Sequence, residues 1–296
     1  MAVHRPSADF PRHLRALYRR FPFDRSLAED PLSGVRPLAL DPWHAEVAGI
    51  LAATIAVGNT TSIRRAFADL VERLDGDLAG WVDSARDDRP DPRLEGFHHR
   101  WIRAEHLEYL GYRLHEIRAR SGSLEEVFRA GLGPEGDFAG GIDRLAHALR
   151  GPEPGAPGPR PPPGYLRLFP TPLGPNRSPC KRLTLFVRWM VRTEYPDLGM
   201  WRRVSPAVLR VPLDQHVYWI AYHLGLTARR SRTWATVEEV TAALRKVDGN
   251  DPVRFDFVLC HTGISGDCPK RADLRVCGPC VVRPDCRLWR GRKGIP

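Results

Sequence analysis

The residue type at position 181 is the first feature that points to chemistry. Of the 45 basic residues in the chain, only four are lysines, at positions 181, 246, 270 and 293. An arginine keeps its proton, whereas a lysine can lose it, act as a nucleophile and form a Schiff base. Lys181 is therefore a candidate nucleophile. The alternative interpretation is a solvent-exposed lysine at the start of a helix.

The residues around Lys181 predict such a helix. Its predicted start is near Ser178, with Pro179 in the first turn, where proline is tolerated. The amine of Lys181 would then lie by the positive end of the helix dipole, which lowers its pKa. Helical spacing is seen for the apolar residues Leu183, Phe186, Val187, Met190 and Val191.

Four cysteines near the C-terminus form the second candidate site. Cys268, Cys277, Cys280 and Cys286 are separated by eight, two and five residues. In a cytosolic protein such clustering favours metal or cluster ligation over disulfides. Four thiolates can hold zinc or an iron–sulfur cluster. The segment lacks the paired knuckles of most four-cysteine zinc sites, which favours a [4Fe–4S] cluster over zinc.

The two remaining cysteines are interpreted as buried thiols. Cys260 falls on a predicted helix and outside the four-cysteine pattern. Cys180 adjoins Lys181 and is a candidate reactive thiol, but burial at the helix start is the preferred interpretation because free cysteine is among the most buried residue types.

The elements that must position these residues are predicted to be helices throughout. No strand pattern and no internal repeat is found, so the predicted fold class is all-α. Asp41-Pro42, Ser123-Leu-Glu-Glu126, Asp214 and Thr236-Val-Glu-Glu239 are helix-start signals, and Asp251-Pro252 is predicted to open a last helix that reaches about His261. Further helices are predicted for residues 10–20, 63–74, 104–120 and 137–149.

Two connecting segments differ from the others. Residues 58–61, Gly-Asn-Thr-Thr, form a tight polar turn between two apolar helices, and such a turn is exposed enough to contact a ligand. Residues 151–164 contain 11 prolines and glycines in 14 positions, which predicts a linker or exposed loop without regular structure.

The distribution of charge indicates the kind of partner. The formal net charge is +10; residues 176–296 carry a net +11 and residues 1–175 a net −1. A polyanion, and nucleic acid in particular, is the partner that this surplus favours. The alternative is an arginine-rich composition that merely keeps the surface soluble. No apolar run is long enough to span a membrane and no signal sequence is found, so a cytoplasmic, nucleoid-associated protein is expected.

Three of these features together resemble the helix-hairpin-helix DNA glycosylase superfamily. Pro212-Leu-Asp-Gln-His-Val217 is similar to that superfamily's Val-Asp-Thr-His element, and the tail resembles the four-cysteine iron–sulfur loop of endonuclease III and the adenine glycosylases. Lys181 and Asp214 are 33 positions apart, a spacing similar to that of the archaeal 8-oxoguanine glycosylases. Two departures exist: Pro172 to Pro179 has one glycine where the relatives have two, and the first cysteine gap is eight residues where they have six.

The resemblance implies two helical lobes with DNA across the cleft between them. Residues 41–192 would form one lobe with Lys181, residues 193–296 the other with Asp214 and the cluster loop 260–286, and residues 1–40 an arm packed on the second lobe. The implied partner is double-stranded DNA that contains a damaged base, bound by a monomer. Asn59 would fill the gap left by an extruded base, and the other implied DNA-binding residues are Thr60, Gly174, Arg182 and His216.

The chemistry implied by the resemblance is that of a bifunctional DNA glycosylase and AP lyase in base excision repair. Lys181 would attack the sugar C1′, and Asp214 would stabilise the cationic sugar and help to move protons. The resulting Schiff base would permit β-elimination and strand cleavage. The favoured substrate is 8-oxoguanine. The alternatives are an oxidised-pyrimidine glycosylase like endonuclease III and a non-catalytic, metal-stabilised DNA-binding protein.

Overall fold

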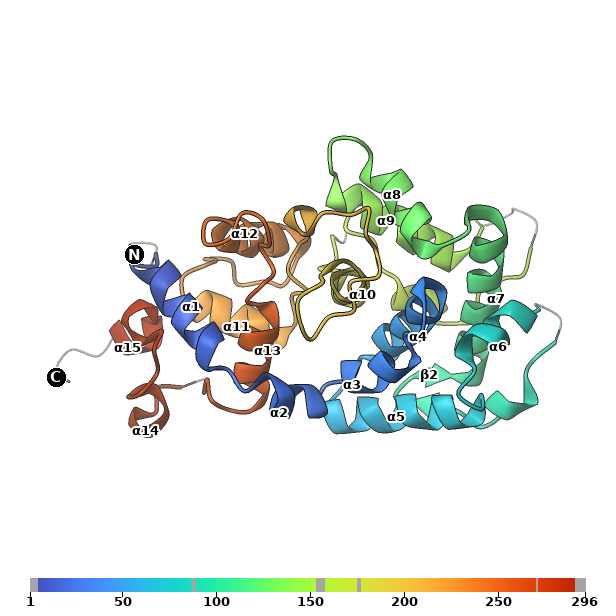
Figure 1. Ribbon diagram of the computed structural model, residues 1–296, viewed down its shortest axis with the longest axis horizontal. Helices are drawn as coiled ribbons and strands as arrows, with labels where there is room; N and C mark the ends of the chain where they lie inside the picture. Colours follow the sequence, from blue (N-terminus) through green and yellow to red (C-terminus); the bar gives the residue numbers. More distant parts are fainter. Residues whose placement is uncertain (1–4, 87–88, 153–157, 175–176, 270, 291–296) are drawn as a thin grey trace.

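The computed structural model describes residues 5–86, 89–152, 158–174, 177–269 and 271–290, and it is mostly helical (Figure 1). The α-helices are α1 (Phe10–Arg20), α2 (Phe23–Ala28), α3 (Leu32–Val35), α4 (Pro42–Ile55), α5 (Thr60–Arg73), α6 (Leu78–Ser84), α7 (Ala104–Ser121), α8 (Leu124–Leu132), α9 (Phe138–Arg150), α10 (Lys181–Val191), α11 (Gln215–His223), α12 (Trp234–Arg245), α13 (Asp256–Ile264), α14 (Leu274–Cys277) and α15 (Arg287–Arg290). Short 3-10 helices cover Arg36–Leu38, Pro92–Leu94, Tyr165–Leu168, Pro206–Val208 and Arg283–Asp285. None of the described helices is both long and apolar enough to cross a lipid bilayer.

The helices form two groups that share one core. In Figure 1, helices α4 to α9 lie on one side, helices α1 and α11 to α15 on the other, and α10 lies between them. Helix α10 packs against α4, α8 against α9, and α11 against α13. A single connected set of buried apolar side chains runs through both groups. This arrangement places the start of α10 near Asp214, the N-cap of α11, and near Asp256, the first residue of α13.

Side-chain caps explain where several helices begin. The carboxylate of Asp41 accepts hydrogen bonds from the amides of Trp43 and His44, and the Ser123 hydroxyl accepts one from the amide of Glu126. These starts agree with the predicted caps, because each cap supplies an acceptor to an amide that has no partner in the first turn.

Two predicted helix starts in the C-terminal part are wrong. Helix α12 begins at Trp234, and the hydroxyl of Thr236 donates to the carbonyl of Ser231, so it does not cap a helix. The last predicted helix begins at Asp256 instead of Pro252. Oδ2 of Asp251 accepts a hydrogen bond from the side chain of Arg192 (2.8 Å), so this carboxylate faces the buried guanidinium and does not cap a helix.

The strand analysis also missed one element. Residues His98–His99 (β1) and Ile102–Arg103 (β2) form an antiparallel hairpin whose tip is Arg100 and Trp101. Strands of two residues are too short to produce the alternating pattern from which strands are predicted. The hairpin lies beside α5 and directly precedes α7 (Figure 1).

The N-terminal arm lies on the C-terminal helices. The amide of Ser7 donates to Oδ1 of Asp285 (2.7 Å), and Nδ1 of His13 lies 2.7 Å from Oδ2 of the same carboxylate. Further along the arm, the ring of Phe23 stacks on Phe257 of α13 with 5.9 Å between ring centres. The two ends of the described chain are therefore joined by polar and aromatic contacts.

Arg188 of α10 and Arg192, which directly follows that helix, form a buried network of ion pairs. Arg188 binds Asp197 (2.9 Å) and also contacts Asp256, and Arg192 contacts the same Asp197 as well as Asp251. Both guanidinium groups are almost completely buried. The network therefore connects α10 to the segment that follows it and to the start of α13.

A second buried charge holds the N-terminus of α8. The carboxylate of Glu46, which is 1% exposed, accepts hydrogen bonds from the amides of Leu124 and Glu125 and from Nε1 of Trp201, at 2.8, 3.0 and 2.7 Å. Burial raises the pKa of Glu46 to about 7, although these three hydrogen bonds act in the opposite direction. The positive end of the α8 dipole also favours a carboxylate at this place.

We expect the replacement Glu46→Gln to remove part of the pH dependence of stability. The folded-state pKa lies above the ordinary value of 4.5, so the contribution of Glu46 is complete below the unfolded value and is lost as the pH rises through about 7. The stability advantage of the wild type over Glu46→Gln should therefore shrink between pH 5 and pH 8, by no more than roughly 3 kcal/mol. Urea unfolding of both proteins at the two pH values measures this; a constant difference would contradict the assignment.

Candidate active site and cysteine cavity

A cavity of about 360 Å³ lies where α10, α11, α13 and the turn between α4 and α5 meet. Its walls include five of the residues that sequence reasoning selected for catalysis or DNA binding: Asn59, Thr60, Lys181, Asp214 and His216. These residues come from three separate parts of the chain. The fold therefore brings together most of the predicted site.

Lys181 and Asp214 face one another in this cavity. Nζ of Lys181 lies 3.9 Å from Oδ2 of Asp214, and the two side chains are 34% and 12% exposed. The other oxygen, Oδ1, accepts a hydrogen bond from the amide of Val217 (2.8 Å), so Asp214 caps α11 as predicted. Because Oδ1 is held by the helix, Oδ2 is the oxygen available to the cavity.

The start of α10 differs from the prediction by three residues. The helix begins at Lys181 and not near Ser178, because Cys180 adopts the left-handed conformation with φ of 48°. This conformation is uncommon for a residue with a side chain. The side chain of Cys180 is buried, as expected, and its thiol donates to the carbonyl of Pro170 (3.1 Å). Burial raises the pKa of that thiol to about 12.

Cys260 belongs to the cavity, which the sequence did not indicate. Its thiol donates to Oδ2 of Asp214 across 3.4 Å, so the same oxygen faces both Cys260 and Lys181. Burial and the neighbouring Asp214 carboxylate raise the pKa of Cys260 well above its usual range. Cys260 is therefore a protonated donor beside Asp214 as well as a packed side chain of α13.

A histidine–carboxylate pair at the cavity wall was also missed. Nε2 of His261 lies 2.9 Å from Oδ2 of Asp30, and both residues line the cavity. Asp30 belongs to the N-terminal arm and His261 to α13. No local sequence signal could have paired two residues that are 231 positions apart.

Asn59 and His216 have clear local roles. Oδ1 of Asn59 accepts a hydrogen bond from the amide of Ser62 (2.8 Å), so this exposed residue caps α5, which begins at Thr60. His216 packs closely against Gly263 of α13: a Cβ atom at position 263 would lie only 2.7 Å from Cβ of His216. Glycine at that position therefore permits the close approach of α11 and α13.

Gly174 and Arg182 lie outside the cavity wall. Gly174 is exposed in a bend with φ of 100°, and the two residues that follow it in the predicted hairpin, 175 and 176, lie outside the described residues. Arg182 donates to the carbonyl of Arg167 (2.8 Å), and its guanidinium carbon lies 6.0 Å from the centre of the Trp101 ring. Burial lowers the pKa of Arg182 to about 10. Its guanidinium is thus engaged by the protein, and a phosphate contact by Arg182 stays a prediction.

The tip of the β1–β2 hairpin lies next to the Asn59 turn. Nε2 of His99 contacts the carbonyl oxygen of Val57 (2.8 Å), and the Arg100 guanidinium lies so close to Gly58 that a Cβ there would be 2.9 Å from it. Arg100 is exposed, and Trp101 is 37% exposed. The hairpin tip therefore carries an exposed cation and an exposed aromatic ring beside the turn that contains Asn59, the residue predicted to fill the gap left by an extruded base.

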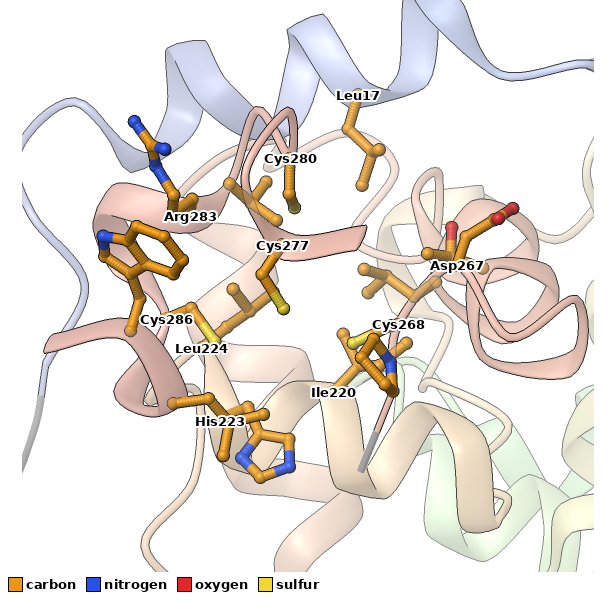
Figure 2. Close-up of a pocket in the computed structure, with 16 residues that line it drawn as sticks. Leu17, Ile220, His223, Leu224, Asp267, Cys268, Cys277, Cys280, Arg283 and Cys286 are labelled. Carbon is orange, nitrogen blue, oxygen red and sulfur yellow. The ribbon is translucent and has the colours of Figure 1, made fainter. Parts of the chain in front are cut away.

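A separate cavity of about 50 Å³ is lined by the four clustered cysteines. Figure 2 shows the sulfur atoms of Cys268, Cys277, Cys280 and Cys286 facing the same interior space. Among the described residues, no group of three or more His, Cys, Asp or Glu side chains is arranged to hold a single metal ion. Four thiolates on one zinc ion must all lie about 2.3 Å from it, whereas each thiolate of an iron–sulfur cluster binds its own iron.

The surroundings of His223, on the wall of this cavity, bear on whether a cofactor fits there. Its side chain is 7% exposed, and neither ring nitrogen has a hydrogen-bond partner in the described part of the chain. Burial raises the pKa of Cys268 to about 12 and also raises that of Cys280 and Cys286. Thiols in such surroundings ionise when a metal supplies positive charge. The donor set and the unpaired imidazole both fit a bound iron–sulfur group.

Comparison with known proteins places the chain in a family. No curated protein matches it significantly. One family model, described as protein of unknown function (DUF2400), matches residues 30–265. The match begins at Asp30 and contains the whole cavity of Lys181 and Asp214, and it ends before Cys268. Because the match covers most of the sequence, the chain belongs to the DUF2400 family.

Proposed function

We propose that the protein is a bifunctional DNA glycosylase and AP lyase that removes an oxidised base. The observation that carries the proposal is the placement of the Lys181 amine beside the Asp214 carboxylate in one cavity, 3.9 Å apart. A cavity of about 360 Å³ is within the usual range of small-ligand sites. An extruded base could therefore enter it, at a cost of a few kcal/mol that is lower for a damaged base.

In the proposed reaction the neutral amine of Lys181 attacks C1′ of the sugar and the base departs. Positive charge develops on the sugar as the glycosidic bond breaks, and the Asp214 carboxylate stabilises that charge. The proton lost by the amine passes to the departing base or to Asp214. The first covalent product is an aminal; its C1′–O4′ bond then breaks, O4′ takes up a proton and the opened sugar is held as a protonated Schiff base, from which loss of a C2′ proton allows β-elimination of the 3′ phosphate. Among oxidised bases we favour 8-oxoguanine, because the spacing of Lys181 and Asp214 resembles that of the archaeal 8-oxoguanine glycosylases.

The surface around the cavity supports DNA as the substrate. Arg100 and Trp101 project from the hairpin beside the Asn59 turn, and the C-terminal part of the chain carries the positive surplus. Basic side chains neutralise phosphates and exposed aromatic rings stack on bases. Asn59 at the turn and the neighbouring hairpin tip together would contact the duplex where the base leaves.

The four clustered cysteines would hold a [4Fe–4S] cluster. When bound, such a group cross-links the loops that carry its ligands and supplies a redox-active centre. It would connect α14 and the last described segment to the end of α11, because all three contribute to the same cavity. Zinc is the less favoured occupant.

We expect sodium borohydride to cross-link the wild-type protein to a duplex that contains 8-oxoguanine. Lys181→Gln and Lys181→Arg should both abolish the cross-link while duplex binding survives, because a guanidinium keeps the charge but has no attacking lone pair. Asp214→Asn should keep the cap of α11 and slow excision by roughly 10²–10³-fold. Gel assays of trapping, excision and binding measure these effects. If Lys181→Arg still cross-links, the nucleophile lies elsewhere; binding without any cleavage in the wild type would identify a non-catalytic DNA-binding protein.

A second expectation concerns the cysteines. Cys280→Ser should remove iron and sulfide from anaerobically prepared protein, because it deletes a cluster ligand. Cys260→Ser and Cys180→Ser are matched controls outside the ligand set, and both should retain the wild-type iron and sulfide content. Metal analysis and visible absorption measure this. Stoichiometric zinc without sulfide in the wild type would overturn the cluster assignment.

The hairpin tip should contribute one phosphate contact. Arg100→Asn removes the charge and keeps a residue that tolerates its left-handed backbone, with φ of 60°. We expect the slope of log K against log salt concentration for duplex binding to become smaller by about 0.9, as loss of one phosphate contact predicts. Arg12→Gln is the control and should keep the wild-type slope, because Arg12 is an exposed side chain of α1, which lies at the other end of the molecule (Figure 1). Identical slopes for both variants would exclude the hairpin from the DNA interface.

A further inference from the structure

His223 lines the cysteine cavity, and among the described residues of this wall it has two buried ring nitrogens without a hydrogen-bond partner. It is the last residue of α11 and lines the cavity with Ile220 and Leu224. In the view of Figure 2 it lies on the side opposite Leu17 of α1, between Cys286 and Cys268. Trp219 stacks against its ring, with 5.9 Å between ring centres.

The burial of this imidazole has an energetic cost. A neutral imidazole always carries one N–H donor, and a buried donor without a partner costs about 1–3 kcal/mol. Neither ring nitrogen of His223 has a partner within the described residues. The apolar side chains of Ile220 and Leu224 line the cavity beside it. The cavity offers the sulfur atoms of its four cysteines as acceptors, and of the oxygen acceptors in its wall, Thr262 and Asp267, Figure 2 shows Asp267 away from His223.

We propose that a ring N–H of His223 donates a hydrogen bond to a sulfur atom of the bound iron–sulfur cluster, either a cysteine thiolate or a bridging sulfide, and thereby raises the reduction potential of the cluster. This inference rests on the proposed assignment of Cys268, Cys277, Cys280 and Cys286 as ligands. It does not depend on the proposed glycosylase chemistry.

The direction of the effect follows from electrostatics. Reduction adds one negative charge to the cluster, and that charge is shared with the sulfur atoms. A donor aimed at sulfur stabilises the reduced state more than the oxidised state, so the potential rises. His223 is thus a positioning and tuning residue and not a fifth ligand, because the four thiolates already complete the cluster.

The test compares three proteins that differ only at position 223. His223→Leu keeps apolar bulk and removes the donor, whereas His223→Gln keeps an N–H donor on a chain of similar reach. All three should contain the same amounts of iron and sulfide. The reduction potential, measured by redox titration of the visible absorption, should be lower in His223→Leu than in the wild type, with His223→Gln closer to the wild type.

A second measurement separates a hydrogen bond from ligation. In protein labelled with ¹⁵N-histidine, the paramagnetic state of the cluster should show a weak hyperfine coupling to one imidazole nitrogen that disappears in His223→Leu. A strong coupling, or loss of iron from both variants, would show that His223 is a ligand and would overturn the proposal. Equal potentials in the three proteins would also overturn it.

The same samples distinguish this inference from the proposed function. A wild-type protein that binds a cluster but gives no borohydride cross-link would refute the glycosylase chemistry and leave the role of His223 intact. A wild-type protein with zinc in place of iron and sulfide would refute the role of His223 and leave Lys181 and Asp214 untouched.

Discussion

The buried ion pairs of Arg188 set the geometry on which the candidate active site depends. Arg188 lies seven residues after Lys181, on the same face of α10, and binds Asp256 at the start of α13. Cys260, one turn after Asp256, reaches Oδ2 of Asp214. The ion pair between Arg188 and Asp256 thus holds α10 against α13. It thereby fixes the amine of Lys181 and the thiol of Cys260 relative to the Asp214 carboxylate. Removing one partner of such a pair leaves an uncompensated buried charge and costs about 3–5 kcal/mol.

Local chemistry in the sequence was sufficient to predict the helical fold class and part of the site. Asp214 caps α11 because an aspartate in that position supplies an acceptor for a free amide, and this can be read from neighbouring residues alone. The scarcity of lysine pointed to Lys181, and the structure places it beside Asp214. The contacts that complete the cavity could not be predicted, since Asp30 and His261 meet only through the packing of the whole chain.

The two wrong helix starts in the C-terminal part have a common physical cause, which is that the predicted capping side chain binds another group. Asp251 carries a good helix-start signal, but its carboxylate binds the buried guanidinium of Arg192. Thr236 has the sequence of a capping residue, but it lies within the first turn of α12 and its hydroxyl donates to the carbonyl of Ser231, which precedes the helix. Local patterns describe what a side chain can do near its own position. A buried charge that needs a partner decides what the side chain does in the folded protein.

The contact between the arm and the tail has a consequence for protein synthesis. Ser7 and His13 leave the ribosome long before Asp285, to which both bind. Asp30 likewise gains its hydrogen-bond partner only after His261 has been synthesised. Helices α4 to α9 can pack while translation continues, because their partners are near in sequence. The cavity that holds Lys181 gains the wall formed by α13 only after that helix has been synthesised, so a nascent or truncated polypeptide without α13 lacks a complete site.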